Sequence, residues 1–368
     1  MSVLSSRNCE LGLWVLLAAL VLSACNKMTD TAEMPGATTA TVAVMPIQQP
    51  QRVGEEPMVL RVAGEPVYAT ELRFWLNYME KYYRESHGIA AIADWNVEQN
   101  GRPLRNFLRD SALSYICNNR AIETQARALG VKLSMQSAQE IDEQRAQNMR
   151  IYGGVSEYRR IVNRMYLSEG VFDYVTQMDY LSRELFAHLY GAQGEQCSDQ
   201  CVSAYVQQQD FMAVRYIFLA NPKGARGGAV KQQRQTLEKL LAQLKVSARP
   251  RELFGKLLTQ YNQDDAMNGY PDGRLISTSA KSEAFVKAYR QLKYYQYSEI
   301  VADDQGLYLI MRMPILPGMN ADAAGHSLRY WAAYQYLFKT QVSQWCAALP
   351  MEYLTAYEQT HADAETVN

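Results

Sequence analysis

The stretch from Phe211 to Leu219, FMAVRYIFL, decides the fold because it marks where a helical sequence gives way to an α+β sequence. Apart from Arg215, its residues are aromatic, aliphatic or otherwise apolar, which predicts a buried β-strand. The residues ahead of it carry the three- and four-residue spacing of amphipathic helices. We therefore expect different kinds of structure on the two sides of this strand.

Beyond the strand, the pattern predicts a compact α+β unit of roughly a hundred residues. Its expected parts are helices over 231–244, 252–261 and 282–292, a polar loop over 262–273 and a second strand over 307–312. Pro314 and Pro317 end this unit. The chain is then expected to be helical again from Ala324 to Tyr357, with a break at Pro350, and to pack back on the residues ahead of the strand.

Ahead of the strand, a short hairpin is expected over 58–68, with a turn at Gly64-Glu65, followed by a helix that Thr70 caps. Further helices are predicted over 104–129, 137–150, 156–163 and 168–190, and a short one from Cys197 through Tyr205. The pattern Ser137-x-x-Glu140 predicts a capping box at the start of its helix.

The first residues have the features of an export signal. An apolar run from Leu11 to Leu22 follows Arg7 and has the length of a signal-peptide core. It ends in LSAC, whose cysteine is Cys25, and this resembles the cleavage box of bacterial lipoproteins. We therefore expect residues 1–24 to be removed and Cys25 to carry lipid. Residues 25–57, rich in Thr, Ala, Gln and Pro, predict a flexible tether.

Composition excludes some classes of protein. The chain has 368 residues, of which 48% are hydrophobic and 20% charged, so wholesale disorder is excluded. Its formal net charge of -1 gives no basic field for the phosphates of a nucleic acid. Tyrosine, at 25 residues against 9 phenylalanines, suits surfaces or grooves where a ring packs and its hydroxyl stays hydrated.

Several segments, in this order, resemble the PrsA/SurA-type extracytoplasmic foldases. VAGEPV at 62–67 matches the family's opening hairpin, and ALGVKLS at 128–134 matches a helix end of the family. The strand VRYIFL at 214–219 matches the V-R-H-I-L-V opening of a parvulin-type peptidyl-prolyl isomerase domain. GLYLIMR at 306–312 matches the late strand G-(Y/F)-H-I-I-(K/R)-V of that domain.

The resemblance implies an α+β fold in which a helical SurA-N-like chaperone module contains an inserted parvulin-like domain. The implied parts are a signal peptide over 1–24, a lipidated cysteine and tether over 25–57, a chaperone domain over 58–208, a parvulin-like domain over 209–316, a returning helical segment over 317–357 and a tail over 358–368.

The family's catalytic positions can be carried over residue by residue. Both family histidines are tyrosines here, Tyr216 and Tyr308, while the catalytic-loop carboxylate falls on Asp264, or on Asp265 with one residue of slippage. A phenol with a pKa near 10 does not replace an imidazole in charge or tautomer. The alternative is a purely structural role, in which both tyrosines are core strand residues and Asp264 caps a loop.

The apolar pocket for proline is altered too. By alignment it keeps Leu275 and Phe285, but the methionine four positions before the phenylalanine is Lys281. We therefore expect weak or absent isomerase activity.

The resemblance implies a foldase or chaperone that binds unfolded exported polypeptides and sits on the outer face of a bacterial cell membrane through its lipid; it also allows a homodimer. An active isomerase and a non-catalytic assembly or scaffold lipoprotein stay open as alternatives. Neither nucleic acid nor a cofactor is expected as a partner.

The remaining cysteines lie in a compartment that permits disulfides. Cys197 and Cys201, four residues apart, predict a link, and Cys117 with Cys346 is a second candidate pair. A metal site is not expected, because the histidines are scattered and none stands in a metal-binding spacing. A metal clip that uses His188 is the weaker alternative.

Overall fold

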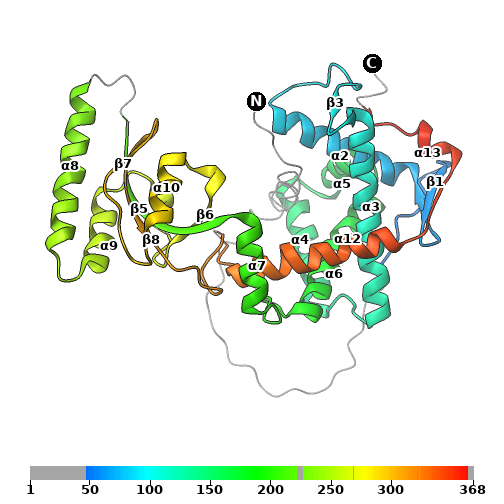
Figure 1. Cartoon of the computed structure of the whole chain (residues 1–368). Helices are drawn as coiled ribbons and strands as arrows, with labels where there is room; N and C mark the ends of the chain where they lie inside the picture. The colour runs from blue at the N-terminus through cyan, green and yellow to red at the C-terminus, as the bar shows by residue number, and fades with distance from the viewer. Residues whose placement is uncertain (1–46, 222–226, 268, 323, 364–368) are drawn as a thin grey trace. The chain divides into compact units, whose positions relative to one another are not determined.

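The computed structural model describes residues 47–221, 227–267, 269–322 and 324–363, which fall into two compact units (Figure 1). The helical unit is formed by the chain up to Glu184 and from Ala348 onward, and the sheet unit by Leu185–Ala347. Together they give the mixed helix and sheet content that the sequence predicts. Cys25 and the expected signal peptide lie outside the described residues.

The helical unit contains a bundle of helices and a small sheet. Its elements are β1 (Met58–Val62), β2 (Glu65–Tyr68), α2 (Ala69–His87), β3 (Glu98–Gln99), β4 (Arg102–Pro103), α3 (Leu104–Leu129), α4 (Met135–Ile151), α5 (Val155–Tyr166), most of α6 (Glu169–Tyr190), β9 (Met351–Tyr353) and α13 (Thr355–Gln359).

Two predicted helix starts are displaced. The N-cap of α4 is Ser134, whose side chain accepts a hydrogen bond from the Ser137 N–H, so the helix begins before the predicted capping box. Thr70 does not cap α2: its N–H and its hydroxyl both donate to the Glu56 carboxylate. In both places a neighbouring polar side chain satisfies the first turn of the helix in another way.

The hairpin turn and the end of the chain also differ from expectation. Ala63 and Gly64, not Gly64 and Glu65, form the turn, with φ of 53° and 81°, the left-handed region that a two-residue hairpin loop requires. Residues 351–353 were expected in a helix, but they form β9, which pairs antiparallel with β1. The resulting sheet has the strand order β2-β1-β9, and it joins the beginning and the end of the helical unit.

Part of the expected tether is ordered against the helical unit. The Gln48 N–H donates to the Gln177 side chain, and the Gln49 amide donates to Glu123. Pro50 is buried. Residues 47–57 are therefore not a flexible tether, because side chains of α3 and α6 bind this segment by hydrogen bonds. Sequence periodicity does not predict such hydrogen bonds.

The sheet unit is built around a four-stranded antiparallel sheet with the order β6-β5-β8-β7. Its elements are the end of α6, α7 (Asp199–Gln209), β5 (Phe211–Ala220), α8 (Gly227–Val246), α9 (Pro250–Tyr261), the 3-10 turns η2 (Asp265–Met267) and η3 (Thr278–Ala280), β6 (Arg274–Ser277), α10 (Glu283–Gln291), β7 (Val301–Ala302), β8 (Gly306–Arg312), α11 (Leu328–Trp331), the π-helical η4 (Ala332–Phe338) and most of α12 (Lys339–Ala348).

The stretch that opened the sequence analysis is β5, and its alternation sorts side chains between two layers. Tyr216 and Phe218 lie on the face that meets α10, and the Tyr216 ring contacts Phe285 of that helix. Arg215 lies on the other face, beside Gly255 of α9. Figure 1 shows α8 and α9 on one side of the sheet and α10 on the other.

The sequence-based boundaries at 208/209 and 316/317 lie inside the sheet unit. The reason is that α7 packs against α11 and η4, so the helices before and after the sheet contact each other. The helix expected from Ala324 begins only at Leu328 and is π-helical over 332–338.

The structure links Cys197 to Cys201 by a disulfide, with 5.9 Å between their Cα atoms.

Candidate functional site

Three aromatic rings gather on the α10 face of the sheet. Tyr216 of β5 and Tyr308 of β8 have ring centroids 5.7 Å apart, and Phe285 of α10 lies 5.7 Å from the first and 5.2 Å from the second. All three meet edge to face and are at most 3% exposed. Phe218 extends the group by stacking on Tyr308 at 4.7 Å.

The loop after α9 brings Asp264 to this ring cluster. Asn262 fixes the loop: its side-chain oxygen accepts from the Phe218 N–H at 2.8 Å, and its amide nitrogen donates to the Asp264 carbonyl at 2.6 Å. The Tyr216 hydroxyl donates to the Asp264 carboxylate. Asp265 instead begins η2 and is exposed, so the unslipped alignment gives the carboxylate that reaches the tyrosine.

Lys281 lies over the rings. Its Nζ is 4.5 Å from the ring centroid of Tyr216, 5.2 Å from Phe285 and 5.3 Å from Tyr308. It also donates to the Tyr216 hydroxyl at 3.3 Å. Burial lowers the pKa of Lys281, against the opposing effect of the Asp264 and Asp303 carboxylates.

The two tyrosines remain neutral phenols at physiological pH. Burial and the hydrogen bond to Asp264 raise the pKa of Tyr216 well above its usual value. Burial and the nearby Asp303 carboxylate do the same for the pKa of Tyr308. Groups with such raised pKa values donate hydrogen bonds but do not exchange a proton near pH 7, so neither ring can act as an imidazole would.

Leu275 does not join the ring cluster. In β6 it pairs with Ala213 of β5, and directly opposed residues share a face, so Leu275 lies on the other face from Tyr216. Its neighbour Arg274 pairs with Val214 on the Tyr216 face and places Nη1 4.0 Å from the Asp264 carboxylate. By alignment Leu275 was expected beside Phe285 in the proline pocket, but the register of β6 places it on the opposite face of the sheet.

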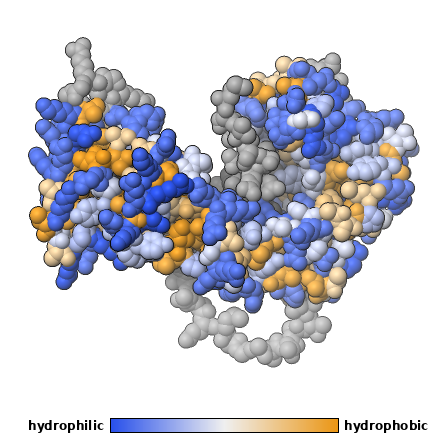
Figure 2. All heavy atoms as spheres, in the orientation of Figure 1, coloured by the Kyte–Doolittle hydropathy of each residue, from blue (hydrophilic) through white to orange (hydrophobic). Residues whose placement is uncertain are grey.

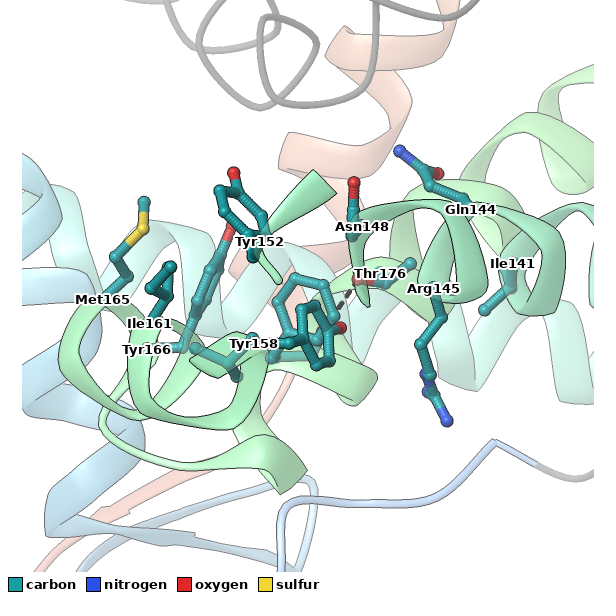
Figure 3. Close-up of a pocket in the computed structure, with 12 residues that line it drawn as sticks. Ile141, Gln144, Arg145, Asn148, Tyr152, Tyr158, Ile161, Met165, Tyr166 and Thr176 are labelled. Atoms are coloured by element: carbon teal, nitrogen blue, oxygen red, sulfur yellow. Dashed lines mark hydrogen bonds between the residues drawn. The ribbon is translucent and has the colours of Figure 1, made fainter. Parts of the chain in front are cut away.

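A second site, which the sequence analysis missed, lies in the helical unit. A pocket of about 60 Å³ is formed by α4, α5 and α6, and Figure 3 shows the side chains that line it. The lining residues are Ile141, Gln144, Arg145, Asn148, Tyr152, Tyr158, Ile161, Val162, Met165, Tyr166, Phe172 and Thr176. The helical periodicity of these segments predicts a packed face but gives no sign that the packing is incomplete.

Exposed apolar side chains accompany this pocket. Met165, which lines it, is 36% exposed, and Ile151 and Val155, from the adjoining ends of α4 and α5, are 62% and 48% exposed. Most of the surface turned to the viewer in Figure 2 is hydrophilic, with smaller hydrophobic areas between. Met165 thus extends the pocket lining to the surface, and Ile151 and Val155 are exposed apolar residues at the ends of two helices that line it.

The described part of the chain has neither a cluster of candidate metal ligands nor a helix long and apolar enough to cross a membrane. It contains no group of three or more His, Cys, Asp or Glu side chains that could hold a metal ion. Within those same ranges, no helix combines the length and hydropathy that crossing a bilayer requires.

No protein-family model matches this chain, and no curated protein matches it. Among solved structures, it is similar to PrsA from Bacillus subtilis, with 15% identity and a TM-score of 0.29, over 70% of this chain and 90% of that one. It is also similar to the peptidylprolyl isomerase PrsA from Bacillus anthracis, with 14% identity and a TM-score of 0.26, over 64% and 95% of the chains.

This chain is also similar to a structure from a study of PEB4 and Cj1289, two SurA-like chaperones of Campylobacter jejuni. The identity is 13% and the TM-score 0.21, over 81% of this chain and 99% of that one. PrsA proteins and SurA-like chaperones are thus among the solved structures that this chain is similar to.

Proposed function

We propose that this protein is a foldase-type chaperone that binds unfolded, exported polypeptides, and that its isomerase-like site has little or no catalytic activity. The observation that carries the proposal is the α4–α5–α6 pocket with its exposed apolar neighbours Ile151, Val155 and Met165. A surface of this kind gains free energy when apolar side chains of an unfolded chain cover it. Methionine suits such a surface because it adapts its shape to different side chains.

The ring cluster supports the loss of catalysis. Rotation about a prolyl peptide bond has a barrier of about 18–20 kcal/mol, so an isomerase must bind the twisted bond better than the planar one. The resemblance places the proline pocket at Phe285, and there the Lys281 ammonium lies over the rings. A prolyl ring would have to displace a charge that is hydrogen-bonded to Tyr216.

An assay of client aggregation tests the chaperone function. The full chain is expected to slow aggregation of a chemically unfolded client at stoichiometric amounts, and the Ile151→Ser/Met165→Ser variant is expected to lose more than about half of this effect. Val246→Ser is the matched control, because Val246 is an exposed aliphatic residue of α8 in the sheet unit. Absence of any effect of the wild-type chain at molar excess would refute the proposal.

Residual isomerase activity is the second candidate, favoured by the hydrogen bonds that link Lys281, Tyr216 and Asp264. A refolding assay limited by prolyl isomerisation distinguishes the two. We expect the uncatalysed rate in the presence of the wild-type chain and of Asp264→Ala alike. An acceleration that Asp264→Ala abolishes would instead establish catalysis at this site.

The location and the range of clients complete the proposal. We propose that lipid on Cys25 holds the protein outside the cytoplasm, so Cys25→Ser is expected to move it from the membrane to the soluble fraction. Capture from membranes is expected to recover many exported proteins at low occupancy. One stoichiometric partner would favour the scaffold alternative, and a second copy of the chain would establish the homodimer.

A further inference from the structure

A row of polar side chains lies along α4 at the edge of the helical pocket. Gln144 and Asn148 follow one another at a four-residue step on α4, and Tyr152 comes four residues later, directly after the last residue of the helix. In Figure 3 the ends of these three side chains point to the same side. Within the described ranges, none of the three side-chain ends has a hydrogen-bond partner, whereas Gln136 and Gln139 on the same helix each donate to a glutamate four residues on.

A buried hydroxyl in the pocket also lacks a partner. Tyr158 is 4% exposed, and its hydroxyl makes no hydrogen bond to any residue in the described part of the chain. A buried polar group without a partner costs free energy, of the order of 1–3 kcal/mol. Because Tyr158 lines the pocket, this hydroxyl is a donor available to an occupant.

The charges at the pocket neutralise each other. Arg145 is the pocket's charged lining residue, and its Nη2 donates to the Asp173 carboxylate at 2.5 Å. In Figure 3 the Arg145 side chain points away from the ends of Gln144 and Asn148. A neutral ligand therefore fits this site better than a phosphate or a lipid headgroup.

The dimensions fit a peptide segment. From Gln144 to Tyr152, directly after the helix end, a helical rise of 1.5 Å per residue gives about 12 Å, the span of roughly three to four residues of extended chain. The pocket volume of about 60 Å³ exceeds the roughly 10–15 Å³ that one water requires, and so has room for the end of a large apolar side chain.

We infer that the α4–α5–α6 pocket is a polypeptide-binding site that anchors one large apolar side chain of an extended client segment. The carboxamides of Gln144 and Asn148 and the hydroxyl of Tyr152 bind main-chain groups of that segment, and the Tyr158 hydroxyl donates to a carbonyl next to the anchored side chain. Main-chain recognition of this kind is independent of sequence, while the pocket selects the anchored residue. This inference rests on the proposed chaperone function and specifies the chemistry of its client site.

Binding of labelled, unstructured host peptides that differ at one guest position tests the inference. The full chain should bind a Phe-guest peptide at least about tenfold more tightly than an Ala-guest peptide. Gln144→Ala/Asn148→Ala should weaken both peptides by one common factor of about five, because it removes main-chain hydrogen bonds. Met165→Ser should weaken only the Phe-guest peptide, and Tyr158→Phe should weaken both.

Gln139→Ala/Glu143→Ala is the matched control, since these residues pair with each other at 2.7 Å on the exposed part of the same helix, and it should leave both affinities unchanged. Unchanged affinities for the Gln144/Asn148 double variant would overturn the inference. If that variant also still suppresses aggregation, the chaperone function survives without this site. If the wild-type chain neither binds nor suppresses aggregation, both proposals fail.

The chain's own segment 42–45, VAVM, is the competing occupant, because the described chain begins at Ile47 and Gln48 is bound to Gln177 of α6, the helix that lines the pocket. The full-length variant Val42→Ser/Val44→Ser/Met45→Ser should bind the Phe-guest peptide like the wild type. A several-fold rise in affinity would show that this segment fills the pocket and would overturn the assignment to a client.

Discussion

Both sites are built from tyrosines, but they treat the phenol hydroxyls differently. In the ring cluster, the Tyr216 hydroxyl donates a hydrogen bond to Asp264 and accepts one from Lys281. In the helical pocket, the equally buried Tyr158 hydroxyl has no partner among the described residues. A polar group that is satisfied inside the fold contributes to stability, whereas a buried one left unsatisfied costs free energy that a ligand's hydrogen bond would recover. This difference in hydrogen bonding is what separates the ring cluster from the proposed binding pocket.

Arg120→Met tests whether a buried polar group that is hydrogen-bonded stabilises the helical unit, as Tyr216 is expected to stabilise the sheet unit. Arg120 belongs to the helical unit, yet it is paired like Tyr216: its Nη2 lies 2.8 Å from the Glu71 carboxylate, it also donates to the Tyr174 hydroxyl, and the Arg120 and Glu71 side chains are each 1% exposed. Removing one member leaves an unpaired carboxylate in the interior. We expect the free energy of unfolding to fall by about 3–5 kcal/mol, measured by chemical denaturation.

Arg127→Met is the control for Arg120→Met. Arg127 lies on the same helix and pairs with Glu123 at 3.0 Å, but its side chain is 66% exposed. Its loss is expected to cost less than about 1 kcal/mol, because solvent screens the pair. Equal effects of the two substitutions would contradict the role assigned to burial.

The second prediction removes one hydroxyl from each site. Tyr216→Phe should lower the free energy of unfolding by about 1–2 kcal/mol, since Asp264 and Lys281 each lose a hydrogen-bond partner. Tyr158→Phe should leave stability unchanged or raise it slightly, because the deleted hydroxyl has no partner in the described structure. The two midpoints of denaturation should therefore move in clearly different ways. A loss of stability in Tyr158→Phe comparable with that in Tyr216→Phe would remove the distinction between the sites.

Some of the candidate site could be predicted from sequence because strand alternation is a local property. The strands that carry Tyr216 and Tyr308 follow from two short apolar runs, whereas the expectation that the two residues belong to one site came from the family resemblance. Phe218, two residues beyond Tyr216, could have been found by the same rule. Leu275 was placed with Phe285 by alignment alone, and the face on which a residue of a short strand lies is fixed only by the register with its partner strand.

Other features depend on contacts that no local pattern encodes. The strand over 351–353 forms because β1 offers it an edge, and the α4–α5–α6 pocket exists because three helices pack incompletely. Lys281 was recognised only as a change in the proline pocket, while its position over three rings required the coordinates. Sequence periodicity reports which face of a helix is buried, not how well that face is filled.

The smallest expected effect concerns Lys281, the charged member of the ring cluster. Burial lowers the pKa of Lys281, which means that the folded environment disfavours its charge despite the rings and carboxylates nearby. Burial disfavours the charged form of Lys281, so the folded state carries an unfavourable desolvation free energy wherever the ammonium is charged. Lys281→Met should therefore raise the free energy of unfolding by at most about 1 kcal/mol at pH 7, because apolar burial and the removed desolvation outweigh the lost cation–π contacts and the lost hydrogen bond to Tyr216.

The gain from Lys281→Met should shrink as pH rises. As pH rises toward the unfolded-state pKa of about 10.4, Lys281 loses its proton first in the folded protein, where its pKa is lowered. In that pH range the unfolded state binds more protons than the folded state, so the free energy of unfolding of the wild type rises with pH. The methionine variant lacks this rise, and since the two proteins share their other titrating groups, their difference isolates Lys281. Denaturation curves at pH 7, 8, 9 and 10 measure it. A constant difference across this range would mean that Lys281 titrates alike in both states, and a stability loss at pH 7 would mean that the ammonium holds the ring cluster together.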